Sequence, residues 1–408
     1  MDRKALDQAY ADAMEQVQAR FPRSADIALL NADALMNLTP WDYWADGGRT
    51  AKGATPRTLA LIEGVLGVRK DMTVEANPDH PGAIHLYIHM VEASDRPERA
   101  APHAARLAAL LPGTGHIVHM PSHIWFRLGQ WRDSLEANRQ AAAVDEAFVA
   151  GGGASLLYSQ AYYAHNVHFV LVSALMGGDG RTAIEAADKL AGIVTDRAKQ
   201  DVPWTQPIAA APFVAHARFS DPERILRLPA PANDFPLVRA HWHYARGEAL
   251  ARLGRHDEAM AEAATIDGMA ALPAMQAMPA AGVPAPDMLH IASRVIAGRI
   301  AQNRKEWDGA VAMFRKRPPC RTGFLYGAAL LVLSGAPVAR RHAADAGQGR
   351  GSRRRLPGGA AAFAQQWLGG IRIAAGRRGP GDTAGAEEAR ALLKQSWFGG
   401  EQPPLEQL

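Results

Sequence analysis

The chain has 408 residues, a net charge of +4 and a single cysteine, Cys320. One cysteine excludes both a disulfide framework and a metal site built from several thiolates within one chain. No apolar run approaches the roughly 18 residues of a membrane helix, and the polar N-terminus lacks the apolar core of a signal peptide, so we expect a cytoplasmic protein.

The positive charge is concentrated in one segment near the C-terminus. Residues 315–378 contain 13 Lys or Arg and one acidic residue, so the other residues together carry a charge of −8. An evenly basic surface would indicate a nucleic-acid partner. A mildly acidic body with one basic segment does not, and we expect neither nucleic acid nor membrane among the partners.

The first half of the chain has the pattern of helices joined by short Pro- and Gly-containing turns. Residues 2–21 are amphipathic, and Ser24 is suited to cap a second helix that runs to residue 38. A loop with several glycines follows, and Pro56 stands in the first turn of the next helix. Further helices are expected after the turn at residues 77–82 and over residues 97–111. No stretch shows the period-2 alternation of a strand.

Several helix–turn–helix stretches look like copies of one repeat. The clearest is ALARLGRHDEA at residues 249–259, and weaker copies lie near residues 125–137, 174–183 and 297–314. Small residues stand where paired helices must approach closely, and glycine permits the tight turn. The expected fold is all-α, a right-handed α-solenoid of tetratricopeptide-like hairpins over residues 1–317. A generic helical bundle is the alternative.

Residues 318–380 break this pattern with a basic segment rich in Arg, Gly and Pro. Three interpretations stay open: a disordered linker, a phosphate-binding arm, or a stretch altered by a shift in the reading frame. The abrupt change of composition favours the third, and we expect poor order there. Residues 381–408 are expected to hold the last repeat helix and a tail.

The strongest functional pattern is IHLYIHMVE at residues 84–92. On a helix, His85, His89 and Glu92 share one face. The rest of this helix is apolar almost all round, so it is expected to be buried. Buried imidazoles and a carboxylate need partners, and two histidines with a carboxylate are a recurring first shell for a transition metal.

Two further histidine clusters follow, HIVHMPSH at residues 116–123 and HNVH at residues 165–168. Pro121 is expected to begin a helix, which leaves the residues before it in a connection. The helices of the three clusters alternate with others, so we expect them on the same inner layer of the solenoid. The predicted metal ligands are His85, His89, Glu92, His119, His123, His165 and His168. The predicted supporting residues are His116, Tyr162 and Asn166.

These patterns favour a metal-dependent enzyme that uses Zn, Fe, Mn or Cu to activate water or O₂, a hydrolase or an oxygenase. Its partner would be a small molecule or a peptide in the concave groove. The alternative is a non-catalytic scaffold for a protein or peptide partner, with the histidines in a structural polar network. The remaining histidines, among them His103, His216, His241 and His243, are expected to be hydrogen-bonded structural residues.

The chain also resembles a family of bacterial proteins known only as tetratricopeptide-repeat-containing. The shared sequence motifs are ALMNLTPWD (34–42), HPGAIHLYIH (80–89), VEAS (91–94), HIVHMPSHIW (116–125) and HNVHF (165–169). The resemblance covers about residues 20–315 and 381–398 and implies an α-solenoid, with no reaction attached. Members begin with additional helices, so we expect this chain to be short at its start. The segment before residue 381 departs from the family.

Overall fold

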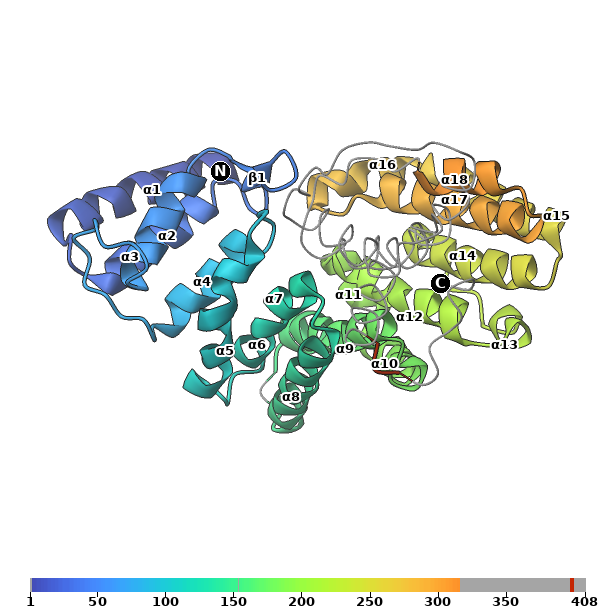
Figure 1. Ribbon diagram of the computed structural model, residues 1–408, viewed down its shortest axis with the longest axis horizontal. Helices are drawn as coiled ribbons and strands as arrows, with labels where there is room; N and C mark the ends of the chain where they lie inside the picture. The colour runs from blue at the N-terminus through green and yellow to red at the C-terminus, as the bar shows by residue number, and fades with distance from the viewer. Residues whose placement is uncertain (1, 153, 316–396, 400–408) are drawn as a thin grey trace, which may run out of the picture. The chain divides into compact units, whose positions relative to one another are not determined.

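The structure, a computed structural model, describes residues 2–152, 154–315 and 397–399. The chain divides into two compact units, with the boundary after residue 144. Over the described residues the regular structure is helical except for two strands of two residues each (Figure 1). The expected all-α class is therefore confirmed.

Two capped helices open the first unit. The side chain of Asp2 accepts a backbone hydrogen bond from the first turn of α1 (Arg3–Arg20). Ser24 does the same for α2 (Ala25–Met36), which packs against α1. These caps satisfy N–H groups that the start of a helix leaves without an intrahelical partner. Both predicted helices are confirmed, within one or two residues at their ends.

Seven further helical elements complete this part of the chain. They are α3 (Thr55–Val65), α4 (Pro81–Val91), the 3-10 turn η1 (Pro97–Ala100), α5 (Ala101–Leu110), α6 (Gly115–His119), α7 (Pro121–Leu128) and α8 (Trp131–Ala150). A proline stands at the start of α3, α4 and α7, where its missing N–H costs no helical hydrogen bond. The unit boundary falls within α8.

The core of the first unit forms around α4, which packs against α3, α5 and α7. Ile84 and Ile88 of this helix are fully buried, together with Leu61 and Ile62 of α3. The prediction of a buried helix at this place is confirmed. The apolar face of α4 fixes its rotation about its own axis, and with it the direction of the histidines on the remaining face.

One sequence prediction about this region is wrong. The residues before Pro121 form a short helix, α6, in place of the expected connection, so His116 and His119 are helical residues. Helix α6 packs against α5 and α7. It has five residues, too few to show a helical period in the sequence, and its formation depends on these tertiary contacts.

A short antiparallel ribbon stands in the loop where no strand was expected. Its strands are β1 (Trp44–Ala45) and β2 (Thr50–Ala51). Gly48 in the turn has a φ of 91°, and a Cβ there would lie 2.5 Å from the backbone nitrogen of Asp95. Trp44 Nε1 donates to the carbonyl of Met90 at 2.7 Å. The ribbon is therefore fixed against the C-terminal end of α4.

The second unit is a succession of paired helices. They are the π-helical turn η2 (Tyr158–Tyr162), α9 (Tyr163–Gly177), α10 (Gly180–Ile193), α11 (Asp196–Asp201), α12 (Thr205–Phe219), α13 (Pro222–Leu226), α14 (Pro236–Arg252), α15 (His256–Ala270), α16 (Pro273–Ala277), η3 (Met278–Ala281), α17 (Ala285–Asn303) and α18 (Trp307–Arg315). Helices α9, α12, α14 and α17 contact one another in turn. Helix α10 packs against α9 and α12, α15 against α14 and α17, and α18 against α17.

The predicted basic segment at 318–380 lies outside the described residues. So does the expected last repeat helix over 381–408, apart from residues 397–399. Within the part of the chain that the structure describes, no helix combines the length and the apolar character needed to cross a membrane.

Candidate metal centre

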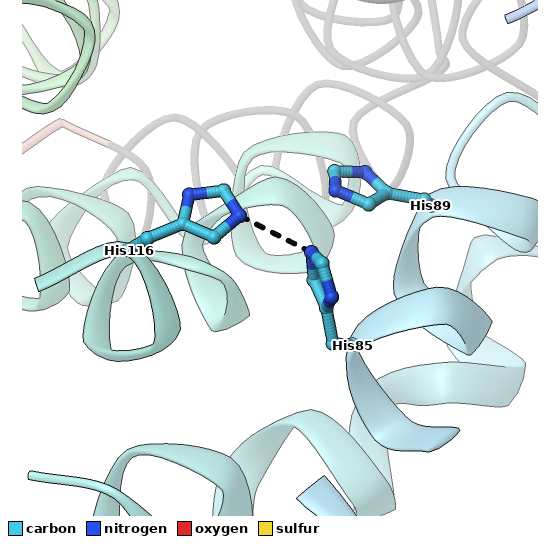
Figure 2. Close-up of side chains that lie close together, drawn as sticks. All are labelled: His85, His89 and His116. Carbon is cyan, nitrogen blue, oxygen red and sulfur yellow. Dashed lines mark hydrogen bonds between the residues drawn. The ribbon is translucent and has the colours of Figure 1, made fainter. Parts of the chain in front are cut away.

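Three histidines from two helices of the first unit bring their ring nitrogens together. His85 and His89 stand one turn apart on α4, and His116 faces them from α6 (Figure 2). One ligand atom from each lies within 4.8 Å of the others. His85 Nε2 and His116 Nε2 lie 3.1 Å apart. This group has the residue types and the convergence of a three-imidazole metal site.

A fourth histidine fixes the start of α4. His80 precedes the helix, and its Nδ1 accepts a hydrogen bond from the Ala83 N–H at 3.4 Å. Its Nε2 lies 2.9 Å from Asp26 Oδ1 on α2. These two contacts tie the N-terminal end of α4 to α2, and the ribbon holds the other end. The helix that carries His85 and His89 is thus held at both ends.

Glu92 directly follows α4 and is 2% exposed. Its Oε1 lies 3.1 Å from His89 Nδ1, and its Oε2 lies 3.2 Å from His123 Nδ1 on α7. An imidazole that donates from Nδ1 to a carboxylate keeps the lone pair on Nε2 available for a metal. Glu92 was predicted as a ligand, and the structure places both of its oxygens on the side of these imidazoles opposite Nε2.

His119 and His123 form a second close pair in the same unit. Their Nε2 atoms are 2.8 Å apart. His119 Nδ1 lies 2.5 Å from Asn138 Oδ1, and the Asn138 amide is oriented by its Nδ2, which donates to the Ser134 carbonyl at 2.6 Å. The Ser122 hydroxyl lies 3.3 Å from the same His119 nitrogen. Asn138 Oδ1 is an acceptor, so it assigns the proton of His119 to Nδ1.

Burial makes all five imidazoles poor bases. It lowers the pKa of His85 and of His89 to about 3, and the neighbouring His116 and His123 lower the value for His85 further. Burial also lowers the pKa of His116 and holds the pKa of His119 and His123 well below the usual value. All five are therefore neutral near pH 7, which is the form that binds a metal ion.

The carboxyl group of Glu92 is subject to opposing influences. Burial raises its pKa, whereas the hydrogen bond from His89 and the positive charge of Arg127 lower it. A buried carboxylate is costly unless positive charge or hydrogen-bond donors surround it. A cation bound by the neighbouring imidazoles would add positive charge at this place and favour the ionised form.

Sequence reasoning did not connect Trp41 with the site. Its ring meets the ring of His89 edge-on, with centroids 4.9 Å apart, and the residue is 42% exposed. Its φ of 63° is in the left-handed region, which a bulky side chain rarely adopts. The only sequence feature that marks Trp41 is the TPWD motif at residues 39–42. Trp41 thus forms a partly exposed wall beside a buried imidazole.

The remaining predicted site residues belong to the second unit. His165 and His168 are buried on α9, and Tyr162 is 41% exposed on the turn before it. Asn166 Nδ2 donates to Asp145 Oδ2 at 2.7 Å. Neither ring nitrogen of His168 has a hydrogen-bond partner among the described residues. Their role as metal ligands and supporting residues stays a prediction.

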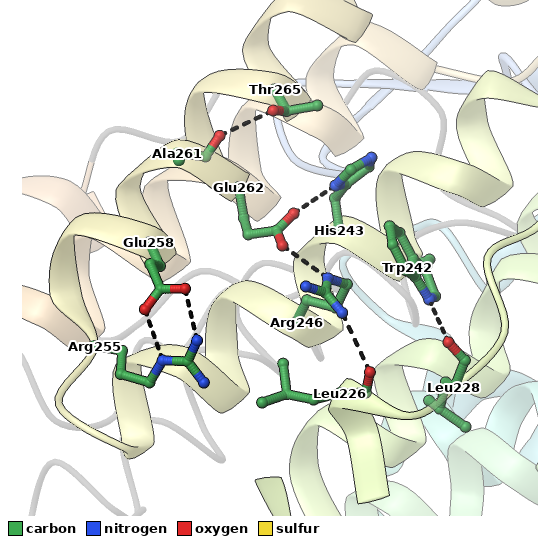
Figure 3. Close-up of polar contacts among 10 residues, drawn as sticks. All are labelled: Leu226, Leu228, Trp242, His243, Arg246, Arg255, Glu258, Ala261, Glu262 and Thr265. Carbon is green, nitrogen blue, oxygen red and sulfur yellow. Dashed lines mark hydrogen bonds and ion pairs between the residues drawn. The ribbon is translucent and has the colours of Figure 1, made fainter. Parts of the chain in front are cut away.

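Several described histidines outside the clusters contact groups other than histidine. In Figure 3, His243 and Arg246 of α14 both bind Glu262 of α15, with 2.7 Å from Arg246 Nε to the carboxylate. His216 Nδ1 lies 2.8 Å from the Ser220 hydroxyl, and His241 Nδ1 donates to a backbone carbonyl one turn earlier. These contacts hold helices and their ends together, as expected for structural histidines.

Comparison with known proteins gives no further identification. The chain matches no protein-family model, no curated protein and no solved structure. The resemblance to tetratricopeptide-repeat proteins stays an expectation from the quoted sequence motifs.

Proposed function

We propose that this protein binds a divalent transition metal through His85, His89 and His116. The observation that carries the proposal is the convergence of three neutral imidazoles from α4 and α6 within 4.8 Å, His89 buried and His85 and His116 half-buried. Glu92 supports it by occupying the Nδ1 atom of His89, which leaves Nε2 for the ion. His116 thereby moves from a supporting role to a ligand, and Glu92 from a ligand to a positioning residue.

The spacing of the ligand atoms fits a metal with cis ligands. Two imidazole nitrogens bound at about 2.0–2.1 Å and at right angles to each other lie about 2.9 Å apart. The distance between His85 Nε2 and His116 Nε2 is 3.1 Å, close to that value. Nitrogen ligation without thiolate suits Zn, Fe, Mn or Cu.

Three protein ligands leave open positions on the metal. Open positions are what a catalytic metal needs to bind and activate water or O₂. We propose a metal-dependent hydrolase or oxygenase, with Trp41 as the exposed wall beside which a small molecule or peptide would approach. His119 and His123 of the first unit remain proposed contributors to this site.

We propose that the helices stack as tetratricopeptide-like repeats. Support comes from the second unit, where α9, α12, α14 and α17 contact in succession while α10, α15 and α18 pack behind them. Close approach requires glycine at two of these contacts. A Cβ at Gly247 of α14 would lie 2.4 Å from Ile296 of α17, and one at Gly298 of α17 would lie 2.6 Å from Phe314 of α18.

The test is the metal content of the purified protein after growth in metal-replete medium. Wild type is expected to hold stoichiometric metal, and His89→Ala to lose it. His103→Ala is the matched control, because His103 lies on α5 of the same unit and contacts Arg106 rather than the cluster. A wild type without metal would refute the proposal.

One observation favours a second candidate, a repeat scaffold whose histidines form a polar network. The 3.1 Å between His85 Nε2 and His116 Nε2 is also an ordinary hydrogen-bond distance. In that case His85→Ala would lower the free energy of unfolding without any change in metal content. The same metal measurement therefore separates the two functions.

A further inference from the structure

Three helices of the second unit bring together a group of charged and polar side chains. The group consists of Arg218 of α12, Tyr244 and Glu248 of α14, and Arg299 of α17. Helix α14 packs against both α12 and α17, and Tyr244 and Glu248 stand one turn apart on it, so they share one face. Both are buried, at 5% and 6% exposure. Arg299 interacts electrostatically with each of the other three, so the four side chains form one cluster.

Arg218 has no acidic partner among the described residues. Its guanidinium stands over the ring of the adjacent Phe219, 5.5 Å from the centroid. Burial and the like charge of Arg299 lower the pKa of Arg218 to about 10, and no carboxylate acts against them. The group is still charged near pH 7. A buried charge without a counter-ion is costly, and an oxyanion bound beside it would remove that cost.

Glu248 is only partly satisfied by its ion pair. Its Oε2 lies 3.4 Å from Arg299 Nε, whereas a charge-assisted hydrogen bond of this kind is usually about 2.7–2.9 Å long. Its Oε1 is buried and has no hydrogen-bond partner among the described residues. Arg252 is a third guanidinium close enough to lower the pKa of Glu248, so three positive groups and one negative group give the cluster a net charge of +2. The cluster therefore lacks an anion, and one of its buried acceptors lacks a donor.

We infer that Arg218, Tyr244, Glu248 and Arg299 bind a small oxyanion that also carries an O–H or N–H donor. The anionic oxygens accept from the two guanidinium groups and from the Tyr244 hydroxyl, and the donor binds Glu248 Oε1. Hydrogen phosphate and α-amino acids share this chemistry. Sulfate and acetate are matched oxyanions without the donor. All four residues belong to the second unit, so the inference does not depend on the proposed metal site.

The experiment is a calorimetric titration of the metal-free, full-length protein near neutral pH with four probes: phosphate, sulfate, glycine and acetate. At least one donor-carrying probe should bind at least about tenfold more tightly than its matched partner, because the partner offers no proton to Glu248 and is repelled by it. Preference for phosphate over sulfate identifies inorganic phosphate as the ligand class, and preference for glycine over acetate identifies an amino acid. Absence of binding by all four probes, or equal binding within both pairs, would overturn the inference.

Two variants test the assigned roles. Arg218→Gln should weaken binding of the preferred probe at least about tenfold, because it removes a charged donor. Arg197→Gln is the control and should bind as wild type does, because Arg197 is 78% exposed on α11 and pairs with Asp201. Glu248→Gln should abolish the preference within the pair, because its amide can donate to the oxyanion without a donor. A preference that persists in Glu248→Gln would refute the role of Oε1.

Two further measurements keep the outcomes separate. Circular dichroism verifies the fold of each variant, and the comparison of the probe pairs on wild type decides the question if a variant does not fold. His89→Ala, which removes a ligand of the proposed metal site, should bind the preferred probe as wild type does. Loss of binding in that variant would place the anion outside the second unit and overturn the inference, whereas the metal content of wild type decides the proposed function by itself.

Discussion

Replacement of Glu92 by glutamine tests how the site is organised. One carboxylate oxygen accepts from His89 Nδ1 at 3.1 Å, and the other lies 3.2 Å from His123 Nδ1. The amide of Glu92→Gln keeps one acceptor oxygen and turns the other atom into a donor. One imidazole must then present a bare Nδ1, which moves its proton to Nε2 and removes a metal ligand.

The expected loss of metal affinity is about 10- to 100-fold, the usual effect of removing a group that orients a ligating histidine. This corresponds to about 1.4–2.7 kcal/mol. The assay is competition with a chelator of known affinity. Glu98→Gln is the control, because Glu98 is half-exposed and pairs with Arg96 at the surface. An affinity within threefold of wild type for Glu92→Gln would refute the positioning role.

Three further outcomes are expected. Burial lowers the pKa of His85 and of His89 to about 3 from the ordinary value near 6.5. Between these two pH values the unfolded chain therefore binds protons that the folded chain does not. The free energy of unfolding of the metal-free protein, measured with urea, should fall as the pH drops from about 6.5 to about 3, by up to about 1.4 kcal/mol per pH unit for each histidine. A pH-independent midpoint over this range would contradict the burial of neutral imidazoles. Because Trp41 contacts His89, Cu²⁺ should quench part of the tryptophan fluorescence in wild type and less of it in Trp41→Phe. Trp242→Phe of the second unit is the control. Equal quenching in both variants would show that Trp41 does not lie beside the metal. Removal of metal by a chelator should lower the free energy of unfolding by about 2.7 kcal/mol relative to protein in metal at 100 times its Kd, and an unchanged thermal midpoint would mean that the folded state binds no ion.

The elements that the sequence predicts well have their signals within a few residues. Ser24 caps α2, and Pro56 and Pro121 stand in the first turns of α3 and α7, where sequence-local chemistry decides the start of a helix. The spacing of His85 and His89 also follows from α4 alone. These features depend on local geometry, so one sequence is enough to place them.

The features that the sequence does not reveal depend on tertiary contacts. The ribbon at Trp44 is held by the end of α4, and α6 is a single short helix held by α5 and α7. The same contacts bring His116 to within 3.1 Å of His85 and bring His123 to the far oxygen of Glu92. Nothing in the spacing within one helix tells which side of an imidazole a carboxylate from another segment will contact.

A recurring pattern of small residues predicts that the helices stack as repeats. Gly247 and Gly298 do stand where neighbouring helices come too close for a Cβ. Close approach restricts the residue type at these two contacts, and the repeat arrangement itself stays a prediction.

The most direct test of the central claim is a crystal structure of the metal-loaded protein with diffraction data collected on both sides of the metal absorption edge. We predict an anomalous peak about 2.0–2.3 Å from a ring nitrogen of each of His85, His89 and His116. Crystals grown with excess metal that give no peak there, with His85 and His116 still hydrogen-bonded to each other, would contradict it.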